Sequence, residues 1–265
     1  MFRMTLVFAV LALPGFAAAH DTWLQTNTQL IRVGDAVHVD LMLGNHGNDH
    51  RDFKLASKVD PAGGTTVVIA PSGKRYDLAD RFVDLGYAPK EGFHSAKFAV
   101  AESGLYTVAH ASDRIVNHGE PARSLKSAKT YFVASAGLDK PKTDNPGFDV
   151  PLGHPLEIVP QANPVLPMGP GQAIRVRVLL KGEPLANARV SFVPRGETLS
   201  EGFDGRNERK TDAKGEASFT PTTGNYYLVV VHHVAPDEKG ADYVQTNYSA
   251  TLAVLVPEVC PCCGE

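Results

Sequence analysis

A histidine lies directly behind a run of alanines near the start of the chain, at residue 20 in the sequence AAAHDTW. The preceding residues are typical of an export signal, with Arg3, an apolar run and small residues that suit a signal peptidase. Cleavage after Ala19 would make His20 the first residue of the mature chain. Its α-amine and ring Nδ1 could then chelate one metal ion, because both groups lose protons near physiological pH. Trp23, the only tryptophan, is expected to anchor this chain end.

Other histidines supply candidates for the remaining metal ligands. His46 lies in the loop sequence GNHGNDH, directly after an expected strand, and His110 ends another expected strand. His232 and His233 follow the apolar run YYLVVV. Because side chains alternate along a strand, at most one of these two can join a given site. We therefore predict a metal site formed by the amine and imidazole of His20 together with one or two imidazoles from His46, His110 and His232.

The three cysteines all lie in the last six residues, at Cys260, Cys262 and Cys263. None of them can link two distant strands, so we expect the fold to be held by packing alone. Cys260 and Cys263 have the C-x-x-C spacing of a thiolate metal ligand pair, but a partner pair for a zinc site is absent. The sequence predicts a cysteine-containing tail and leaves its role open.

Strand patterns dominate the rest of the chain. In AVHVDLML the apolar residues Val37, Val39 and Leu41 alternate with His38 and Asp40, which predicts a strand with one buried face. Similar short segments recur between turn signals, so we predict an all-β protein built from β-sandwiches. The expected strands are 37–43, 65–70, 94–100, 105–109, 129–134, 173–180, 188–193, 226–232 and 248–256.

A change of composition divides the chain into two predicted domains. Proline recurs every few residues between 141 and 170, and this disfavours both helix and central strand. We predict an N-terminal sandwich that carries the metal site and a C-terminal Ig-like sandwich, joined by a proline-rich connector. The predicted segments are a signal peptide at 1–19, the domains at 20–147 and 160–257, the connector at 148–159 and a tail at 258–265.

Charge and motif content exclude several classes of function. The formal net charge is -3 with acids and bases interspersed, so nucleic acid is not an expected partner. After the signal, no segment is long and apolar enough to predict insertion into a membrane. We found no H-E-x-x-H, G-x-S-x-G, P-loop or G-x-G-x-x-G motif, and we therefore expect a binding protein rather than an enzyme.

Several stretches of this chain resemble one exported family of domains of unknown function, the family numbered 4198. The resemblance is carried by HDTW at 20–23, SAKTYFV at 127–133, LGHPLEIVPQANP at 152–164, KGEPLANARVSF at 181–192 and TDAKGEASF at 211–219. That family is commonly described as a periplasmic component of nickel or cobalt uptake. The resemblance implies a prealbumin-like or Ig-like second domain, and metal binding through His20 and His46. The additional histidines and the cysteine tail depart from the family pattern and leave the metal open.

Three hypotheses for function follow. The first is a periplasmic or secreted protein that captures Ni(II) or Co(II) and passes the ion to a membrane transporter. Nitrogen donors also bind Cu(II) and Zn(II), and Cu(II) most tightly, so ligand type alone does not identify the metal. The second is a copper oxidase with a histidine brace, and the third is a metal-free structural β-sandwich in which every histidine is incidental.

Overall fold

The structure is a computed structural model that describes residues 20–44, 46, 59–86, 91–139 and 141–258. The predicted signal peptide and the cysteines lie outside these residues. Strands and short 3-10 turns make up the regular structure of the described chain, which confirms the all-β prediction. The strands are β1 (Asp21–Thr26), β2 (Leu30–Arg32), β3 (Ala36–Gly44), β4 (Gly64–Ile69), β5 (Arg75–Asp77), β6 (Val83–Asp84), β7 (His94–Ala99), β8 (Gly104–His118), β9 (Glu120–Ser135), β10 (Leu156–Pro160), β11 (Ile174–Leu180), β12 (Glu183–Pro184), β13 (Arg189–Pro194), β14 (Glu208–Lys210), β15 (Glu216–Phe219), β16 (Asn225–Ala235) and β17 (Thr246–Val256).

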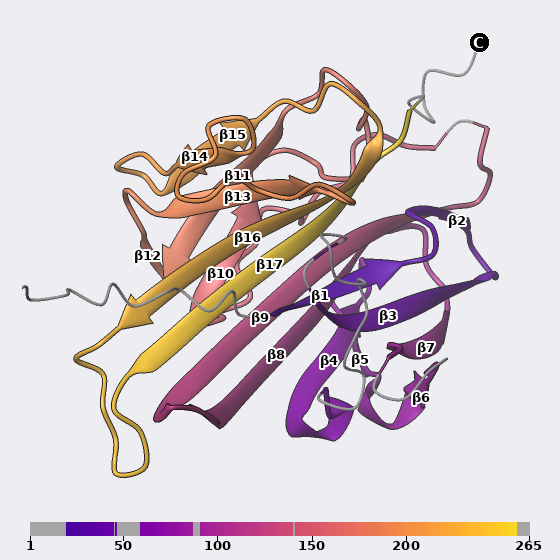
Figure 1. Cartoon of the computed structure of the whole chain (residues 1–265). Coiled ribbons are helices and arrows are strands. Elements are labelled where there is room, and N and C mark those ends of the chain that lie inside the picture. The colour runs from indigo at the N-terminus through magenta and orange to yellow at the C-terminus, as the bar shows by residue number, and fades with distance from the viewer. Residues whose placement is uncertain (1–19, 45, 47–58, 87–90, 140, 259–265) are drawn as a thin grey trace, which may run out of the picture.

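One nine-stranded sheet forms the centre of the molecule (Figure 1). Its strand order is β14-β13-β16-β17-β9-β8-β4-β5, and β2 also pairs with β9. The parallel pairing of β17 with β9, from Thr246 opposite Arg123 to Ala253 opposite Thr130, joins the two predicted domains within this sheet. The predicted connector, at 148–159, follows β9 and overlaps the first four residues of β10. β10 is an edge strand.

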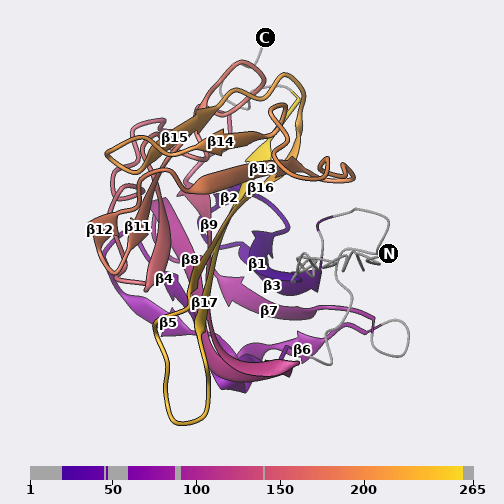
Figure 2. The same cartoon turned by 60° about the vertical axis from the view of Figure 1, so that its left-hand side comes forward.

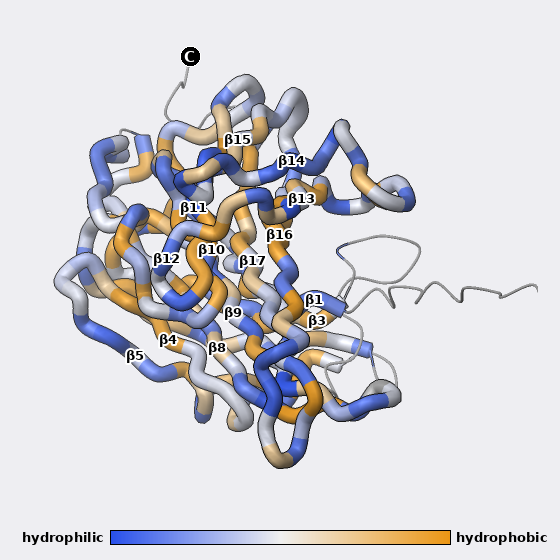
Figure 3. The backbone as a smooth tube through the Cα atoms, turned by 90° about the vertical axis from the view of Figure 1, so that its left-hand side faces the viewer, coloured by the Kyte–Doolittle hydropathy of each residue, from blue (hydrophilic) through white to orange (hydrophobic). Residues whose placement is uncertain are grey.

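Two smaller sheets cover opposite faces of the large one, which makes a layered β-sandwich (Figure 2). One has the order β1-β3-β7-β6, and the other contains β10, β11, β12 and β15. The alternation of side chains along β9 explains both layers. Ala128 and Phe132 pack in the core beneath β1, β3 and β7, whereas Tyr131 and Val133 pack in the core beneath β10 and β11. Figure 3 shows hydrophobic residues mainly along the strands and hydrophilic ones in most loops.

The predicted strands are present, and three of them are longer than expected. In β3, Val37, Val39 and Leu41 are buried and His38 is exposed, as the alternation predicts. β8, β9 and β16 extend past the small sheets with β17 (Figure 1). This extension is largely polar and hydrogen-bonded along its whole length, so hydrophobic alternation did not mark its limits.

A buried ion pair ties β10 to the large sheet. Lys129 on β9 and Glu157 on β10 are each 2% exposed. The Glu157 carboxylate also accepts hydrogen bonds from the backbone nitrogens of Leu152, Gly153 and His154, at 2.6, 2.9 and 3.1 Å. These three N–H donors, together with Lys129, take the place of the water molecules that would otherwise solvate the Glu157 carboxylate. The pair therefore fixes the end of the proline-rich segment onto β9.

No helix among the described residues is long and apolar enough to span a membrane.

Candidate metal centre

The start of β1 lies against β9 and β17 of the large sheet, and side chains from these strands hold its backbone. Lys126 Nζ on β9 donates a hydrogen bond to the carbonyl oxygen of His20 at 2.9 Å. Thr251 Oγ1 on β17 donates to the carbonyl oxygen of Thr22 at 2.8 Å. β1 also pairs with β3, from Asp21 opposite Gly44 to Thr26 opposite Val39. The residue predicted to become the chain end is therefore placed by contacts on two sides.

Asp21 forms an ion pair with His232 on β16. His232 Nε2 lies 2.7 Å from Asp21 Oδ1, and Ser249 Oγ donates to the same oxygen at 3.3 Å. The Asp21 charge raises the pKa of His232 above its ordinary value, against the effect of burial. Burial is the largest single influence and would raise the pKa of Asp21, but the charge and hydrogen bond of His232, with smaller contributions from Lys126 and Ser249, together lower it. His233 points to the opposite face of the sheet, where its ring lies 6.0 Å from that of Tyr248, as the alternation predicts.

His46 lies at the same end of β1, two residues after the strand partner of Asp21. Its side chain is 3% exposed, and its ring packs edge-on against Trp23 with 5.5 Å between ring centroids. Its φ of 52° is in the left-handed region, which turns the chain sharply after β3. The backbone nitrogen of Gly196, in the second predicted domain, donates to the His46 carbonyl oxygen at 3.4 Å.

The His46 imidazole is neutral, and one of its nitrogens has no partner in the described part of the chain. Burial, and next the charge of Arg195, lower its pKa to about 3, although a hydrogen bond to the Val193 backbone opposes this shift. Nδ1 is buried and has no hydrogen-bond partner among the residues that the structure describes. The bond to Val193 must therefore be made by Nε2–H, which leaves a lone pair on Nδ1. A ring held by a backbone carbonyl through one nitrogen is typical of metal-binding histidines.

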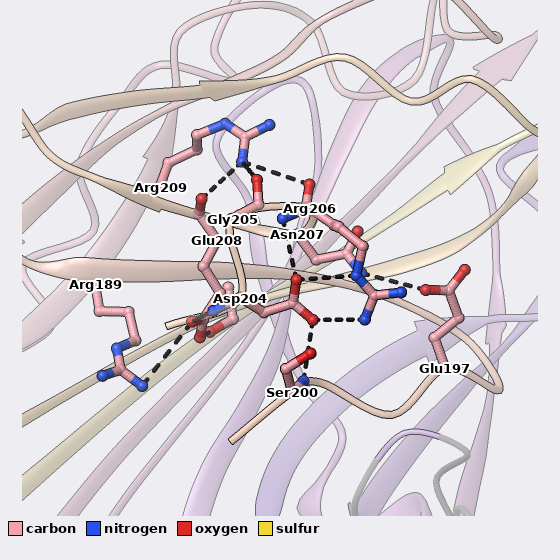
Figure 4. Close-up of polar contacts among 10 residues, drawn as sticks. Arg189, Glu197, Ser200, Asp204, Gly205, Arg206, Asn207, Glu208 and Arg209 are labelled. Carbon is pink, nitrogen blue, oxygen red and sulfur yellow. Dashed lines mark hydrogen bonds and ion pairs between the residues drawn. The ribbon is translucent and has the colours of Figure 1, made fainter. Parts of the chain in front are cut away.

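The loop that contacts His46 is residues 195–207, between β13 and β14, and its backbone donates hydrogen bonds to two buried carboxylates, Asp204 and Glu208 (Figure 4). Asp204 accepts hydrogen bonds from the backbone nitrogens of Ser200 and Arg206, both at 3.0 Å, and from Arg206 Nη2 at 2.7 Å. Glu208 accepts from the Asp204 backbone nitrogen at 2.7 Å. Leu199 of this loop packs against the hydrophobic cluster that contains Trp23. The loop therefore contacts the His46 backbone through Gly196 and the cluster that contains Trp23 through Leu199.

His110 lies on the same face of the large sheet as His232, but its hydrogen-bond partner is Thr66 and not Asp21. Its side chain is 3% exposed, and Nδ1 lies 2.8 Å from Thr66 Oγ1 on β4. Burial, and next the charge of Arg114, lower its pKa to about 4. β8 and β16 are separated by β9 and β17 in the sheet, so three strand spacings, roughly 14 Å, lie between His110 and His232. The structure does not bring these two predicted ligands together.

The described part of the chain contains no group of three or more His, Cys, Asp or Glu side chains that could hold a metal ion. It does place His20, Asp21, His46 and His232 at one end of β1. Sequence reasoning missed Asp21, Lys126 and Thr251, which act on the start of β1. Of these three, only Asp21 had a signal in the sequence, namely its position beside His20. The contacts of Lys126 and Thr251 depend on the pairing of β9 with β17.

The sequence matches a family model described as Domain of unknown function (DUF4198), over residues 17–235. The chain belongs to the DUF4198 family. All four predicted histidine ligands of this DUF4198 protein lie within the matched residues, and the cysteines lie outside them. No curated protein matches its sequence.

Several solved structures show a distant likeness to this DUF4198 protein. Fibronectin(III)-like modules of Clostridium thermocellum CbhA are 10% identical, with 88% of this chain and 94% of the other covered and a TM-score of 0.21. A Salmonella alpha-2-macroglobulin mutant is 15% identical, with 92% and 15% covered and a TM-score of 0.27. A DUF4785 family protein from Legionella pneumophila is 13% identical, with 78% and 51% covered and a TM-score of 0.28. Nothing about the function of this chain follows from similarities this weak.

Proposed function

We propose that this protein binds a transition-metal ion at the start of β1, between the processed chain end and His46. In this proposal His20, exposed by cleavage after Ala19, supplies its α-amine and its imidazole. His46 supplies Nδ1. The ion is cargo: the protein is exported to the periplasm or secreted, captures Ni(II) or Co(II), and passes it to a membrane uptake system.

The His46 imidazole is the observation that carries this proposal. A buried histidine normally satisfies both ring nitrogens, yet within the described ranges of the chain His46 Nδ1 has no partner. A pKa near 3 keeps the ring neutral throughout the physiological range, so no proton competes with a metal ion at this nitrogen. The bond to the Val193 backbone fixes the tautomer that leaves Nδ1 available.

The chain end supplies donors that side chains alone do not. The α-amine of His20 exists only after cleavage, and an amine and an imidazole on one residue form a chelate ring around one ion. Both groups titrate near neutral pH, so little proton competition opposes binding.

The preference for Ni(II) or Co(II) rests on the family resemblance and not on geometry. Nitrogen donors favour late first-row metals, but Cu(II) binds such ligands more tightly and Zn(II) comparably. Exchangeable coordination with an open position suits a protein that passes its ion onward.

Trp23 allows a direct test, because it is the only tryptophan and its ring touches His46. The mature protein that begins at His20 is titrated with Ni(II), Co(II), Cu(II) and Zn(II), by calorimetry and by Trp23 emission. The same titrations are made with one alanine added before His20, with His46→Gln, and with His38→Gln as control, since His38 is exposed on β3.

We expect the added alanine and His46→Gln each to weaken binding by at least about tenfold, and His38→Gln to have no effect. Unchanged affinity in both altered proteins would refute the proposed site. The emission maximum of each metal-free variant reports whether the surroundings of Trp23 are intact. Oxidase activity that requires Cu(II), His20 and His46 would instead favour the histidine-brace enzyme.

A further inference from the structure

Three contacts hold the first residues of β1, and together they come from three strands of the large sheet. Lys126 on β9 binds the His20 carbonyl oxygen, His232 on β16 binds the Asp21 carboxylate, and Thr251 on β17 binds the Thr22 carbonyl oxygen. We call this set of contacts the chain-end clamp. The clamp uses two carbonyl oxygens and one carboxylate, which are not the donors proposed for the metal ion.

We propose that His232 is a positioning residue that holds the processed chain end in place through Asp21, and that it is not a metal ligand. This inference rests on the proposed function for its effect on metal binding, and it replaces the sequence-based prediction that His232 coordinates the ion. His232 Nε2 is already directed at the Asp21 carboxylate, which Ser249 also binds. Asp21, the residue that follows His20, is thereby fixed to β16 and β17.

The clamp matters because a free chain end normally frays. A frayed His20 would have to be ordered each time an ion binds, and the loss of conformational freedom would weaken binding. Contacts that order residues 20–22 beforehand remove this cost without touching the ion. Lys126 contacts two of these residues, since its Nζ also lies 3.4 Å from Thr22 Oγ1.

The clamp also explains why the site needs both halves of the chain. Lys126 lies in the first predicted domain, whereas His232, Ser249 and Thr251 lie in the second. They meet at β1 because β17 pairs with β9, with Ser249 opposite Lys126. His232 is in turn opposite Ser249. One row across β9, β17 and β16 therefore presents Lys126, Ser249 and His232 to the start of β1, and Thr251 lies two residues further along β17.

The test compares His232→Ala with His232→Gln in the mature full-length protein. A glutamine amide can donate to Asp21 but does not replace an imidazole as a metal ligand. His233→Gln is the matched control, because this neighbouring histidine points to the opposite face. The first readout needs no metal: the rate at which an aminopeptidase removes His20, followed by intact mass. The second readout is the Ni(II) affinity by calorimetry.

We expect His232→Ala to speed removal of His20 by about tenfold or more and to weaken Ni(II) binding by a similar factor. His232→Gln should restore both quantities toward wild type, and His233→Gln should change neither. Lys126→Met provides a second variant, because it removes a different contact of the clamp; it should also speed removal of His20.

Two results would overturn the inference. Removal of His20 at the wild-type rate in His232→Ala and in Lys126→Met would show that the contacts do not order the chain end. Loss of Ni(II) binding in His232→Gln with a wild-type rate of His20 removal would show that His232 is a ligand. If wild type binds none of the metals, the proposed function fails, while the aminopeptidase rates still decide whether the clamp exists.

Discussion

His232 Nε2 lies 2.7 Å from the Asp21 carboxylate, although the two residues are 211 positions apart in the chain. This pair connects the first strand of the described chain to the strand before the last one. It also ties Asp21, the second residue after the predicted cleavage site, to a strand in the second half of the protein.

The Asp21–His232 pair should stabilise the protein within a limited pH window. The raised pKa of His232 contributes stability below the ordinary value of 6.5, and this is lost as the pH rises through the folded-state pKa. The lowered pKa of Asp21 contributes above 3.8 and is lost as the pH falls through its folded-state pKa. Urea unfolding of wild type and His232→Ala should therefore differ most near about pH 5, and less at about pH 8.5. A difference that increases steadily toward alkaline pH would contradict this prediction.

Buried neutral histidines should make the protein sensitive to acid. The pKa values of His46 and His110 are lowered to about 3 and about 4, so the unfolded chain takes up these protons first as the pH falls below 6.5. Stability then decreases with falling pH, by up to about 1.4 kcal/mol per pH unit for each group. We expect His110→Gln to reduce this slope between pH 6 and 4. An unchanged slope in denaturant unfolding, or an NMR titration of the His110 ring near pH 6.5, would contradict it.

Breaking the Lys129–Glu157 pair should be strongly destabilising. Glu157→Gln leaves the Lys129 ammonium 2% exposed and without its counter-charge, which typically costs about 3–5 kcal/mol. The double variant Lys129→Met with Glu157→Gln removes both charges and should recover part of this loss. Chemical unfolding at neutral pH measures both effects. A double variant less stable than Glu157→Gln alone would show that charge burial is not the cause.

Asp204 should control the surroundings of Trp23 from a distance. Asp204→Ala removes the acceptor that organises the loop at residues 195–207, and Leu199 of this loop packs against the hydrophobic cluster that contains Trp23. We expect a shift of Trp23 emission to longer wavelength and faster quenching by acrylamide. Asp212→Ala is the matched control, because Asp212 accepts backbone hydrogen bonds in a different turn, from Lys214 and Glu216. Equal emission in the two variants would contradict a supporting role for this loop.

The local pattern determined the strands because side-chain alternation is a property of a few consecutive residues. The burial of Val37, Val39 and Leu41, and the opposite directions of His232 and His233, could both be predicted in this way. The buried Lys129–Glu157 pair was not predicted, although each of the two is a single charged residue within an apolar strand. The sequence also marked His20, since the feature that makes it chemically unusual is its position behind the alanines.

Tertiary structure decided which of these residues meet. The parallel pairing of β17 with β9 aligns Ser249 with Lys126 and so brings His232 to Asp21. The same sheet order keeps His110 three strands from His232. Pairing between strands that are distant in sequence depends on the packing of the whole chain, and no local pattern specifies it. For that reason the sequence determined the strands and the candidate histidines, and only the fold decided that His46 and the chain-end clamp share one end of β1.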